Sequence, residues 1–241
     1  MSIFYPEWII NPEANFISRF LLKDHFRRYE FASKRLKGLY VLDIGCGSGY
    51  GCKILAKSAK QVVGVDISNT AINTAISNYG KDNIDFYQSD ACTLIFPNDF
   101  FDCVVSFEMI EHLTRRDAQK FLEEAKRVLK PNGKVIISTP EKRNVSLSGK
   151  SVNPYHKCEY SLQDFKNLVG DFFIIEKVYG QDFTNINLIN LFKLFAAGII
   201  RKPVQFIWRI FQKLHFHQGD VVDYKNGEKI PWVNIICAYK I

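Results

Sequence analysis

The sequence predicts an α/β protein built on a doubly wound, mostly parallel sheet. Short apolar runs alternate with stretches of helical periodicity along most of the chain, which is typical of parallel strands covered by helices. The first apolar run also leads through a glycine-rich turn into a helical pattern, which indicates a nucleotide-type site at the end of a strand. A length of 241 residues, with 47% hydrophobic residues, suits one packed domain.

The glycine-rich turn follows an apolar run at 39–44 that is typical of a buried strand. Four glycines stand at alternate positions in it: Gly45, Gly47, Gly49 and Gly51. Glycine lets a ligand approach the backbone closely, and the first N–H groups of the helix expected at 50–59 attract anionic groups. The spacing excludes a dinucleotide fingerprint, because Gly49 stands one residue too early for it.

Further strands bring carboxylates to the same edge of the sheet. The patterns predict strands at 61–66, 84–88, 101–107 and 134–139, and helices at 13–36, 69–79 and 114–129. Asp66 ends the second strand about 20 residues after the turn, where an acid accepts hydrogen bonds from ribose hydroxyls. Ser68 is the expected N-cap of the next helix. Asp90 follows the third strand and either contacts a ligand or caps a turn.

These motifs resemble those of class I S-adenosylmethionine-dependent methyltransferases over about 25–140. The likeness rests on D-x-G-C-G-x-G, which begins at Asp43, and on the stretches FDCVVSFEMIEHL and RVLKPNGKVIISTP. It implies a Rossmann-like sheet of seven strands in the order 3-2-1-4-5-7-6, with the last strand antiparallel. It also implies S-adenosyl-L-methionine as the cofactor and S-adenosyl-L-homocysteine as the product.

Within this resemblance a set of cofactor contacts is expected around the turn and the strand ends. The set comprises Arg28, Tyr29, Asp43, Gly45, Cys46, Gly47, Gly49, Asp66, Ile67, Asp90, Ala91, Phe107 and Glu108. Asp90 would accept a hydrogen bond from the adenine amine, while Arg28 and Tyr29 would close over the amino-acid end. The alternative for 25–32 is an amphipathic cap helix with a charged outer face.

A second resemblance lies beyond the core. The stretch NPYHKCEYSLQDF at 153–165 is similar to an element of type 11 and type 23 methyltransferases from bacterial surface-polysaccharide clusters. Ser161, with Asp164 three residues later, predicts a capped helix start. Another strand is expected at 172–180. The expected organisation is a single domain over 1–241, with an N-terminal cap at 1–37, a core at 38–180, a helical insertion at 183–230 and a last strand at 231–241.

The expected insertion is basic and amphipathic. Between 183 and 219 there is no Asp or Glu, and apolar residues follow helical spacing on both sides of Pro203. Such helices suit the surface of an anionic membrane, with 186–217 as the expected contact. A lid packed on the catalytic domain explains the pattern equally well. No nucleic-acid partner is expected, because the aromatic residues lie on the apolar helix faces.

Cysteine usage and the first residues indicate the compartment. The six cysteines are widely spaced without a C-x-x-C pair, which favours a reducing cytoplasm over a disulfide framework. The start has no signal-peptide pattern. We therefore expect a cytoplasmic protein, with possible peripheral contact at the inner face of the membrane. The spacing of potential ligands shows no metal constellation, so no metal is expected.

Two histidines are candidates for proton removal from an acceptor hydroxyl. His112 follows the strand at 101–107, and His156 precedes Glu159, a potential orienting acid, by three residues. His156 is preferred because its element is expected to face the acceptor, although proximity alone is an alternative to base catalysis.

The expected reaction is methylation of a hydroxyl on a sugar or a lipid-linked glycan of envelope polysaccharide biosynthesis. Two alternatives stay open: O-methylation of a quinone or lipid at the membrane surface, and a non-catalytic RNA-binding protein that keeps this fold.

Overall fold

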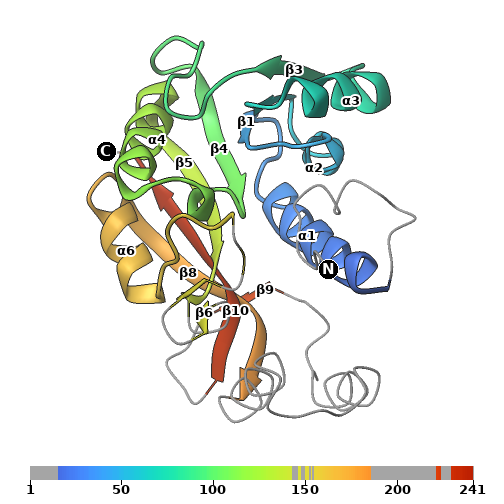
Figure 1. Cartoon of the computed structure of the whole chain (residues 1–241). Coiled ribbons are helices and arrows are strands. Elements are labelled where there is room, and N and C mark those ends of the chain that lie inside the picture. The colour runs from blue at the N-terminus through green and yellow to red at the C-terminus, as the bar shows by residue number, and fades with distance from the viewer. Residues whose placement is uncertain are drawn as a thin grey trace.

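The computed structural model describes residues 16–142, 146–147, 150–151, 153, 155–185, 221–223 and 229–240 (Figure 1). Within them, eight strands form one sheet in the order β3-β2-β1-β4-β5-β10-β8-β9. The bounds are β1 (Tyr40–Ile44), β2 (Gln61–Asp66), β3 (Ile84–Gln88), β4 (Phe101–Phe107), β5 (Leu129–Pro140), β8 (Ile174–Asn185), β9 (Val221–Asp223) and β10 (Lys229–Tyr239). β10 runs antiparallel to both β5 and β8. With β8 and β10 as sixth and seventh strands, the predicted order 3-2-1-4-5-7-6 is confirmed.

Helices cover both faces of the sheet (Figure 1). Their bounds are α1 (Phe16–Ser33), α2 (Tyr50–Leu55), α3 (Asn69–Tyr79), α4 (Arg115–Val128) and α6 (Leu162–Gly170), with a short 3-10 helix η2 (Ile110–His112) after β4. Buried side chains of α1, α2 and α3 form one core with one face of the sheet, and those of α4 and α6 form a second core with the other face. The carboxyl ends of β1, β2, β4 and β5 therefore lie between two helical layers.

Local caps explain where several helices begin. Thr114 Oγ1 accepts a hydrogen bond from Asp117 N–H at the start of α4, and Ser68 Oγ does so from Ala71 N–H at α3, as predicted. At α6 the predicted Ser161–Asp164 pair is present: Ser161 Oγ accepts from Asp164 N–H at 3.2 Å and donates to its carboxylate at 2.7 Å.

The region expected to be a helical insertion is partly sheet. β8 extends to Asn185, β10 begins at Lys229, and β9 adds an edge strand that pairs antiparallel with β8. All three intrude into the interval 183–230. The two helices expected within 186–217 lie outside the described residues. A separate two-stranded sheet of β6 (Ser146–Leu147) and β7 (Lys150–Ser151) stands between β5 and α6.

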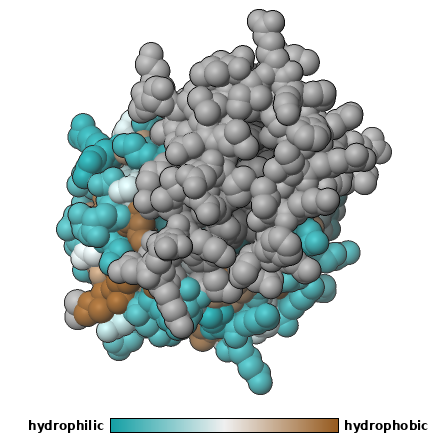
Figure 2. Space-filling model, turned by 90° about the horizontal axis from the view of Figure 1, so that it is seen from below, coloured by the Kyte–Doolittle hydropathy of each residue, from teal (hydrophilic) through white to brown (hydrophobic). Residues whose placement is uncertain are grey.

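Seen from below, the described residues at the periphery are mostly hydrophilic, with small hydrophobic patches between them (Figure 2). None of the helices in the described part of the chain combines the length and the apolar character that crossing a membrane requires. All six cysteines are described, and each is a free thiol.

Candidate functional site

The turn between β1 and α2 is hydrogen-bonded to the carboxyl end of β2. Cys46 N–H donates to Val65 O at 3.0 Å, which continues the β1–β2 pairing into the turn. Gly47 N–H donates to Asp66 Oδ2 at 3.0 Å, and Ser68 N–H donates to Asp66 Oδ1 at 2.9 Å. The half-buried Asp66 carboxylate therefore stands at the rim of the glycine turn, as the sequence predicts.

The glycines of the turn serve two different purposes. Gly45, Gly47 and Gly49 all have positive φ, a conformation that favours glycine. A Cβ on Gly45 would lie 2.7 Å from Met109 Cγ, and one on Gly49 would lie 2.7 Å from Phe86 Cζ, so these two allow close packing. A Cβ on Gly47 would meet no heavy atom within 4 Å. Gly47 is thus the glycine that borders open space and suits a ligand.

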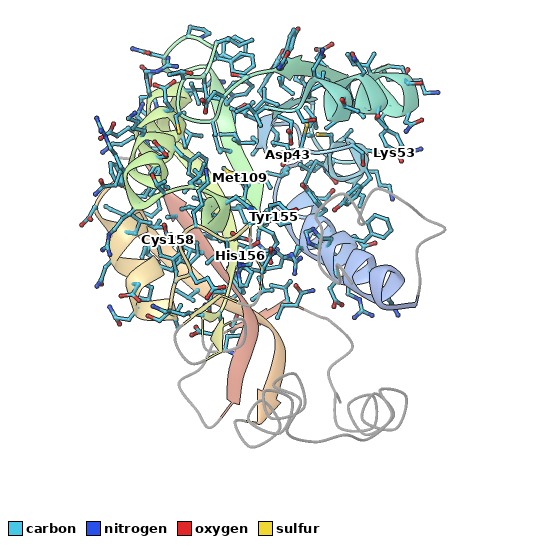
Figure 3. The ribbon with its side chains drawn as sticks, viewed as in Figure 1. Asp43, Lys53, Met109, Tyr155, His156 and Cys158 are labelled. Atoms are coloured by element: carbon cyan, nitrogen blue, oxygen red, sulfur yellow. The ribbon has the colours of Figure 1, made fainter. Side chains whose placement is uncertain are left out.

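A second group of polar residues lies at the ends of β4 and β5. The carbonyl of Glu111, in η2, accepts hydrogen bonds from Lys157 N–H at 2.9 Å and Cys158 N–H at 3.1 Å. His112 Nδ1 lies 3.2 Å from the carbonyl oxygen of Tyr155. These bonds fix the segment 155–160 against η2. Figure 3 shows Tyr155, His156 and Cys158 below Asp43 in that view, with Met109 between them.

This arrangement brings the three predicted catalytic candidates together. His156 Nδ1 lies 3.1 Å from Glu159 Oε1, and their side chains are only 7% and 4% exposed. The rings of His112 and His156 meet edge to face, with centroids 5.2 Å apart. Glu111, His112 and His156 each offer a potential metal ligand within 4.8 Å of the others. Sequence spacing gave no sign of this cluster, because folding brings His156 to residues that lie far from it in the sequence.

Comparison with known proteins identifies the family. The family model described as a methyltransferase domain matches residues 42–137. A probable S-adenosylmethionine-dependent methyltransferase of Mycolicibacterium smegmatis is 32% identical over 186 residues, which span 75% of this chain and 70% of that protein. The chain belongs to the class I S-adenosylmethionine-dependent methyltransferases. The cofactor of this family is S-adenosylmethionine, and its product is S-adenosylhomocysteine.

Other relatives of this methyltransferase match a smaller part of their length. A probable S-adenosylmethionine-dependent methyltransferase of Mycobacterium tuberculosis is 34% identical over 151 residues, which are 61% of this chain and 54% of that protein. The chain thus spans about half the length of that relative. A ubiquinone biosynthesis O-methyltransferase of Bradyrhizobium diazoefficiens is 39% identical over 105 residues, 43% of this chain and 41% of that protein.

Solved structures agree with the fold. A protein of Pyrococcus horikoshii superposes with a TM-score of 0.62 at 19% identity, covering 98% of this chain and 96% of that one. An S-adenosylmethionine-dependent methyltransferase of Mesorhizobium loti gives 0.58 at 18% identity, covering 88% and 98%. At these identities the likeness shows the fold alone.

Arg28, on α1, fits the expected role at the anionic amino-acid end of the cofactor. Its side chain is 3% exposed, and one terminal nitrogen donates to Gln181 Oε1 at 2.5 Å. Its Nε is buried without a hydrogen-bond partner among the described residues. Because an unpaired buried donor is costly, a carboxylate would be a suitable partner for this Nε. When bound, the cofactor would supply an electrophilic methyl group on its sulfonium centre.

Tyr29 and Asp43 differ from the expectation of direct cofactor contact. Tyr29 is 3% exposed and packs on Gly51, where a Cβ would lie 2.1 Å from Tyr29 Cζ. Its hydroxyl donates to Asp43 Oδ1 at 3.3 Å, and Cys52 Sγ donates to Asp43 Oδ2 at 3.2 Å. Helical periodicity turns Tyr29 inward, so both residues support the turn from below. Burial raises the pKa of the fully buried Asp43 to about 7.

The remaining expected contacts divide into buried and exposed groups. Cys46 and Phe107 are 3% and 4% exposed, and the Phe107 ring stacks edge-on against Tyr29, so their side chains belong to the core. Ile67 is 69% exposed beside Asp66, where it can contact a ligand. Ala91 is half-buried, packed against the core on the α4 side.

The Asp90 side chain stabilises a turn after β3. Its Oδ1 accepts a hydrogen bond from Cys92 N–H at 2.8 Å, and its backbone forms an isolated bridge with Thr93. This is the capping alternative considered for Asp90 from the sequence. The side chain is nevertheless exposed at the end of β3, where contact with the adenine amine stays a prediction.

Glu108 stands in a strained position at the end of β4. Its φ is 54°, although it is not glycine, and its Oε1 accepts a hydrogen bond from Ser138 Oγ at 2.6 Å. Its N–H points to the backbone and side-chain oxygens of Ser138, both at 3.3 Å. A non-glycine residue with positive φ is costly and recurs at functional sites. The strain is held by β5, which supplies Ser138.

Four polar residues of the site were not predicted from the sequence. Glu111 and Glu141 are 1% and 0% exposed, and Ser138 and Thr139 are fully buried at the end of β5. Thr139 Oγ1 donates to Glu111 Oε2 at 3.1 Å. Glu141 Oε2 accepts from Leu162 N–H at 3.0 Å and from Asn234 Nδ2 at 2.9 Å. Both acids closely follow the carboxyl end of a predicted strand, Glu111 after 101–107 and Glu141 after 134–139. That position is the signal that could have identified them from the sequence.

The electrostatics of this second group favour the neutral forms of Glu111 and His112. Burial raises the pKa of Glu111 well above its usual value, and the charge of Glu108 raises it further. Burial lowers the pKa of His112, and the neighbouring His156 adds to the effect. A neutral imidazole is the form that can accept a proton or bind a metal ion.

Proposed function

We propose that this methyltransferase methylates a hydroxyl group on a sugar or lipid-linked glycan of envelope polysaccharide biosynthesis, in the cytoplasm. The observation that carries the choice of a hydroxyl is the buried His156–Glu159 pair at 3.1 Å. A hydroxyl acceptor must lose a proton, and an oriented imidazole is suited to take it near neutral pH. The glycan class rests on the resemblance of 153–165 to polysaccharide-cluster methyltransferases.

In this proposal Glu159 accepts the Nδ1 proton of His156 in a hydrogen bond and so leaves Nε2 as the basic nitrogen. Arg28 and Asp66 hold the amino-acid and ribose ends of the cofactor, and Gly47 leaves room beside the turn. The oxygen of the acceptor would be positioned by η2 and the segment 155–160. Positioning two reactants accounts for a large part of such a rate enhancement.

The experiment is a transfer assay with methyl-labelled S-adenosylmethionine. Acceptors would be a lipid-linked glycan fraction and soluble nucleotide sugars, with wild-type protein, His156→Ala and the control Gln119→Ala, whose side chain is exposed on α4. We expect label in a glycan, a loss of roughly 100-fold or more in kcat for His156→Ala, and wild-type activity for Gln119→Ala. If no glycan acceptor is labelled, the proposed acceptor class is refuted.

A second candidate is O-methylation of a hydroxylated quinone. The supporting observation is the 39% identity to a ubiquinone biosynthesis O-methyltransferase over 105 residues. A short-chain hydroxyquinone in the same assay separates the two classes, because label in the quinone and not in a glycan would favour this second function. Salt-dependent RNA retention without any methyl transfer would instead favour the non-catalytic alternative.

We also propose peripheral contact with an anionic membrane through 186–217. The support is the sequence pattern, in which Lys193, Arg201, Lys202 and Arg209 accompany an apolar helical face. Flotation with anionic vesicles would test it against a variant in which these four residues are glutamate. Equal flotation of the wild type and the variant would leave 186–217 as a lid on the protein.

A further inference from the structure

The strongest unassigned feature is the cluster of Glu111, His112 and His156. One ligand atom from each lies within 4.8 Å of the other two. Ligands of one ion at bond lengths of about 2.1 Å are roughly 3.4 Å apart in tetrahedral geometry. Small side-chain rotations would therefore bring all three into coordination. One carboxylate and two imidazoles also form a common set for a catalytic divalent metal with an open position.

Both imidazoles are already oriented as metal-binding histidines are. His156 Nδ1 lies 3.1 Å from Glu159 Oε1, and His112 Nδ1 lies 3.2 Å from the carbonyl of Tyr155. A histidine that binds a metal through one nitrogen usually donates its other N–H to a carboxylate or a backbone carbonyl. These contacts assign the Nδ1 proton in each ring and leave Nε2 for a metal ion.

Hydrogen bonds connect the segments around the cluster. The carbonyl of Glu111 accepts hydrogen bonds from Lys157 N–H and Cys158 N–H, which joins η2 to the segment that carries His156. Thr139 Oγ1 holds Glu111 Oε2, and the Glu111 side chain is 1% exposed. A buried carboxylate is costly unless it is paired or coordinates a metal. A divalent cation would offset that cost.

We propose that Glu111, His112 and His156 bind one divalent transition-metal ion, such as zinc, manganese or iron. The proposal rests on the function proposed above, because an open coordination position would receive the oxygen of the acceptor hydroxyl. Coordination lowers the pKa of that hydroxyl, and its proton passes to water. An oxygen lone pair then forms the C–O bond, while the C–S bond breaks and its electron pair returns to sulfur. In the metal-loaded protein His156 is a ligand and no longer the base.

The test is metal titration of the untagged full-length protein after removal of metal with a chelator. Zn²⁺ is the first probe, followed by Mn²⁺ and by Co²⁺, whose visible spectrum reports nitrogen and oxygen coordination. We expect one Zn²⁺ per chain, at least tenfold weaker binding in His112→Ala and His156→Ala, and a tenfold to hundredfold weakening in Glu159→Gln. The matched control Glu123→Gln, on the exposed side of α4, should bind Zn²⁺ as the wild type does.

Binding of S-adenosylhomocysteine to each variant checks that it is folded. Lack of stoichiometric Zn²⁺ binding by the wild type, or binding that all the ligand variants keep, would overturn the proposal. Methyl transfer to a hydroxyl by metal-free protein would overturn the role of the metal while leaving the proposed function intact. Stoichiometric Zn²⁺ binding without transfer to any hydroxyl acceptor would support the metal site and refute the proposed function.

Discussion

The proposed cofactor side, around the turn after β1, and the proposed acceptor side, around η2 and 155–160, are built in different ways. The cofactor side is nearly contiguous in sequence, since the turn after β1 bonds to Asp66 and Val65 only about 20 residues later. The acceptor side joins three separate stretches at the ends of β4 and β5 and at 155–160, through bonds to Glu111 and from Thr139. The first is specified by a local motif and the second by tertiary structure, so changes on each side should have different effects.

The largest effect is expected for Asp43, beneath the cofactor turn. Its folded-state pKa of about 7 exceeds the ordinary 3.8, so the folded protein binds this proton more tightly than the unfolded chain does. The stabilisation is therefore complete below about pH 4 and is lost as the pH rises to about 7, by up to about 4 kcal/mol. Asp43→Asn should remove this dependence. Urea denaturation of both proteins from pH 5 to 8 tests it, and parallel stability curves would contradict it.

The second-largest effect is expected from the packing of Gly51 against Tyr29 beneath the cofactor turn. Gly51→Ala would place a Cβ 2.1 Å from Tyr29 Cζ, inside the core beneath the turn. We expect a loss of about 3 kcal/mol in the free energy of unfolding, since overpacking forces the backbone or the ring to move. Thermal unfolding measures it. Gly170→Ala is the control, because its Cβ would meet only Ile175 Cδ1 at 4.0 Å, and its melting temperature should stay close to that of the wild type.

A change on the acceptor side should separate stability from cofactor binding. Glu141→Ala removes the acceptor of Leu162 N–H and Asn234 Nδ2, which join α6 and β10 to the end of β5. We expect about 2 kcal/mol of destabilisation, because buried donors lose their charged partner. The affinity for S-adenosylhomocysteine, measured by calorimetry, should stay unchanged. A large loss of affinity would show that the two sides are not independent.

The smallest effect is expected for Asp66, where binding changes more than stability. Asp66→Ala should weaken S-adenosylmethionine and S-adenosylhomocysteine by about 1.5 kcal/mol, roughly tenfold, through loss of a charged hydrogen-bond acceptor. Calorimetric titration measures the shift. Asp85→Ala is the matched control, because that exposed carboxylate on β3 contacts Gln61 and not the turn. If both variants bind the cofactor as the wild type does, Asp66 is not a ribose ligand.

The sequence predicted the elements that depend on local pattern. α3, β3 and β4 have the predicted bounds, because an N-cap or a short apolar run defines each of them. The ends of β8 and β10 and the whole of β9 were missed, since their extension depends on pairing between distant segments. No local signal in a single sequence specifies that pairing.

The same division applies to the site. The hydrogen bond from Gly47 N–H to Asp66 follows from a local motif. Tyr29 is a core residue because it lies on the side of α1 that packs against the sheet, which the local sequence did not specify. Glu111 was not among the residues predicted from the sequence, and its meeting with His156 depends on two backbone hydrogen bonds between η2 and the segment 155–160. Residue type and spacing indicated each histidine as a candidate, but they could not predict that the two side chains lie in contact.

The central position of β10 has a consequence for biosynthesis. β8 reaches β5 only through β10, although β8 precedes β10 in the chain. On the ribosome, strands β1 to β5 can pair as they emerge, while β8 must wait for β10 before it can join them. Assembly of the acceptor side, which Asn234 on β10 helps to hold through Glu141, must therefore wait for the synthesis of β10. A nascent chain stalled before β10 would expose the unpaired edge of β5 to chaperones and to other chains.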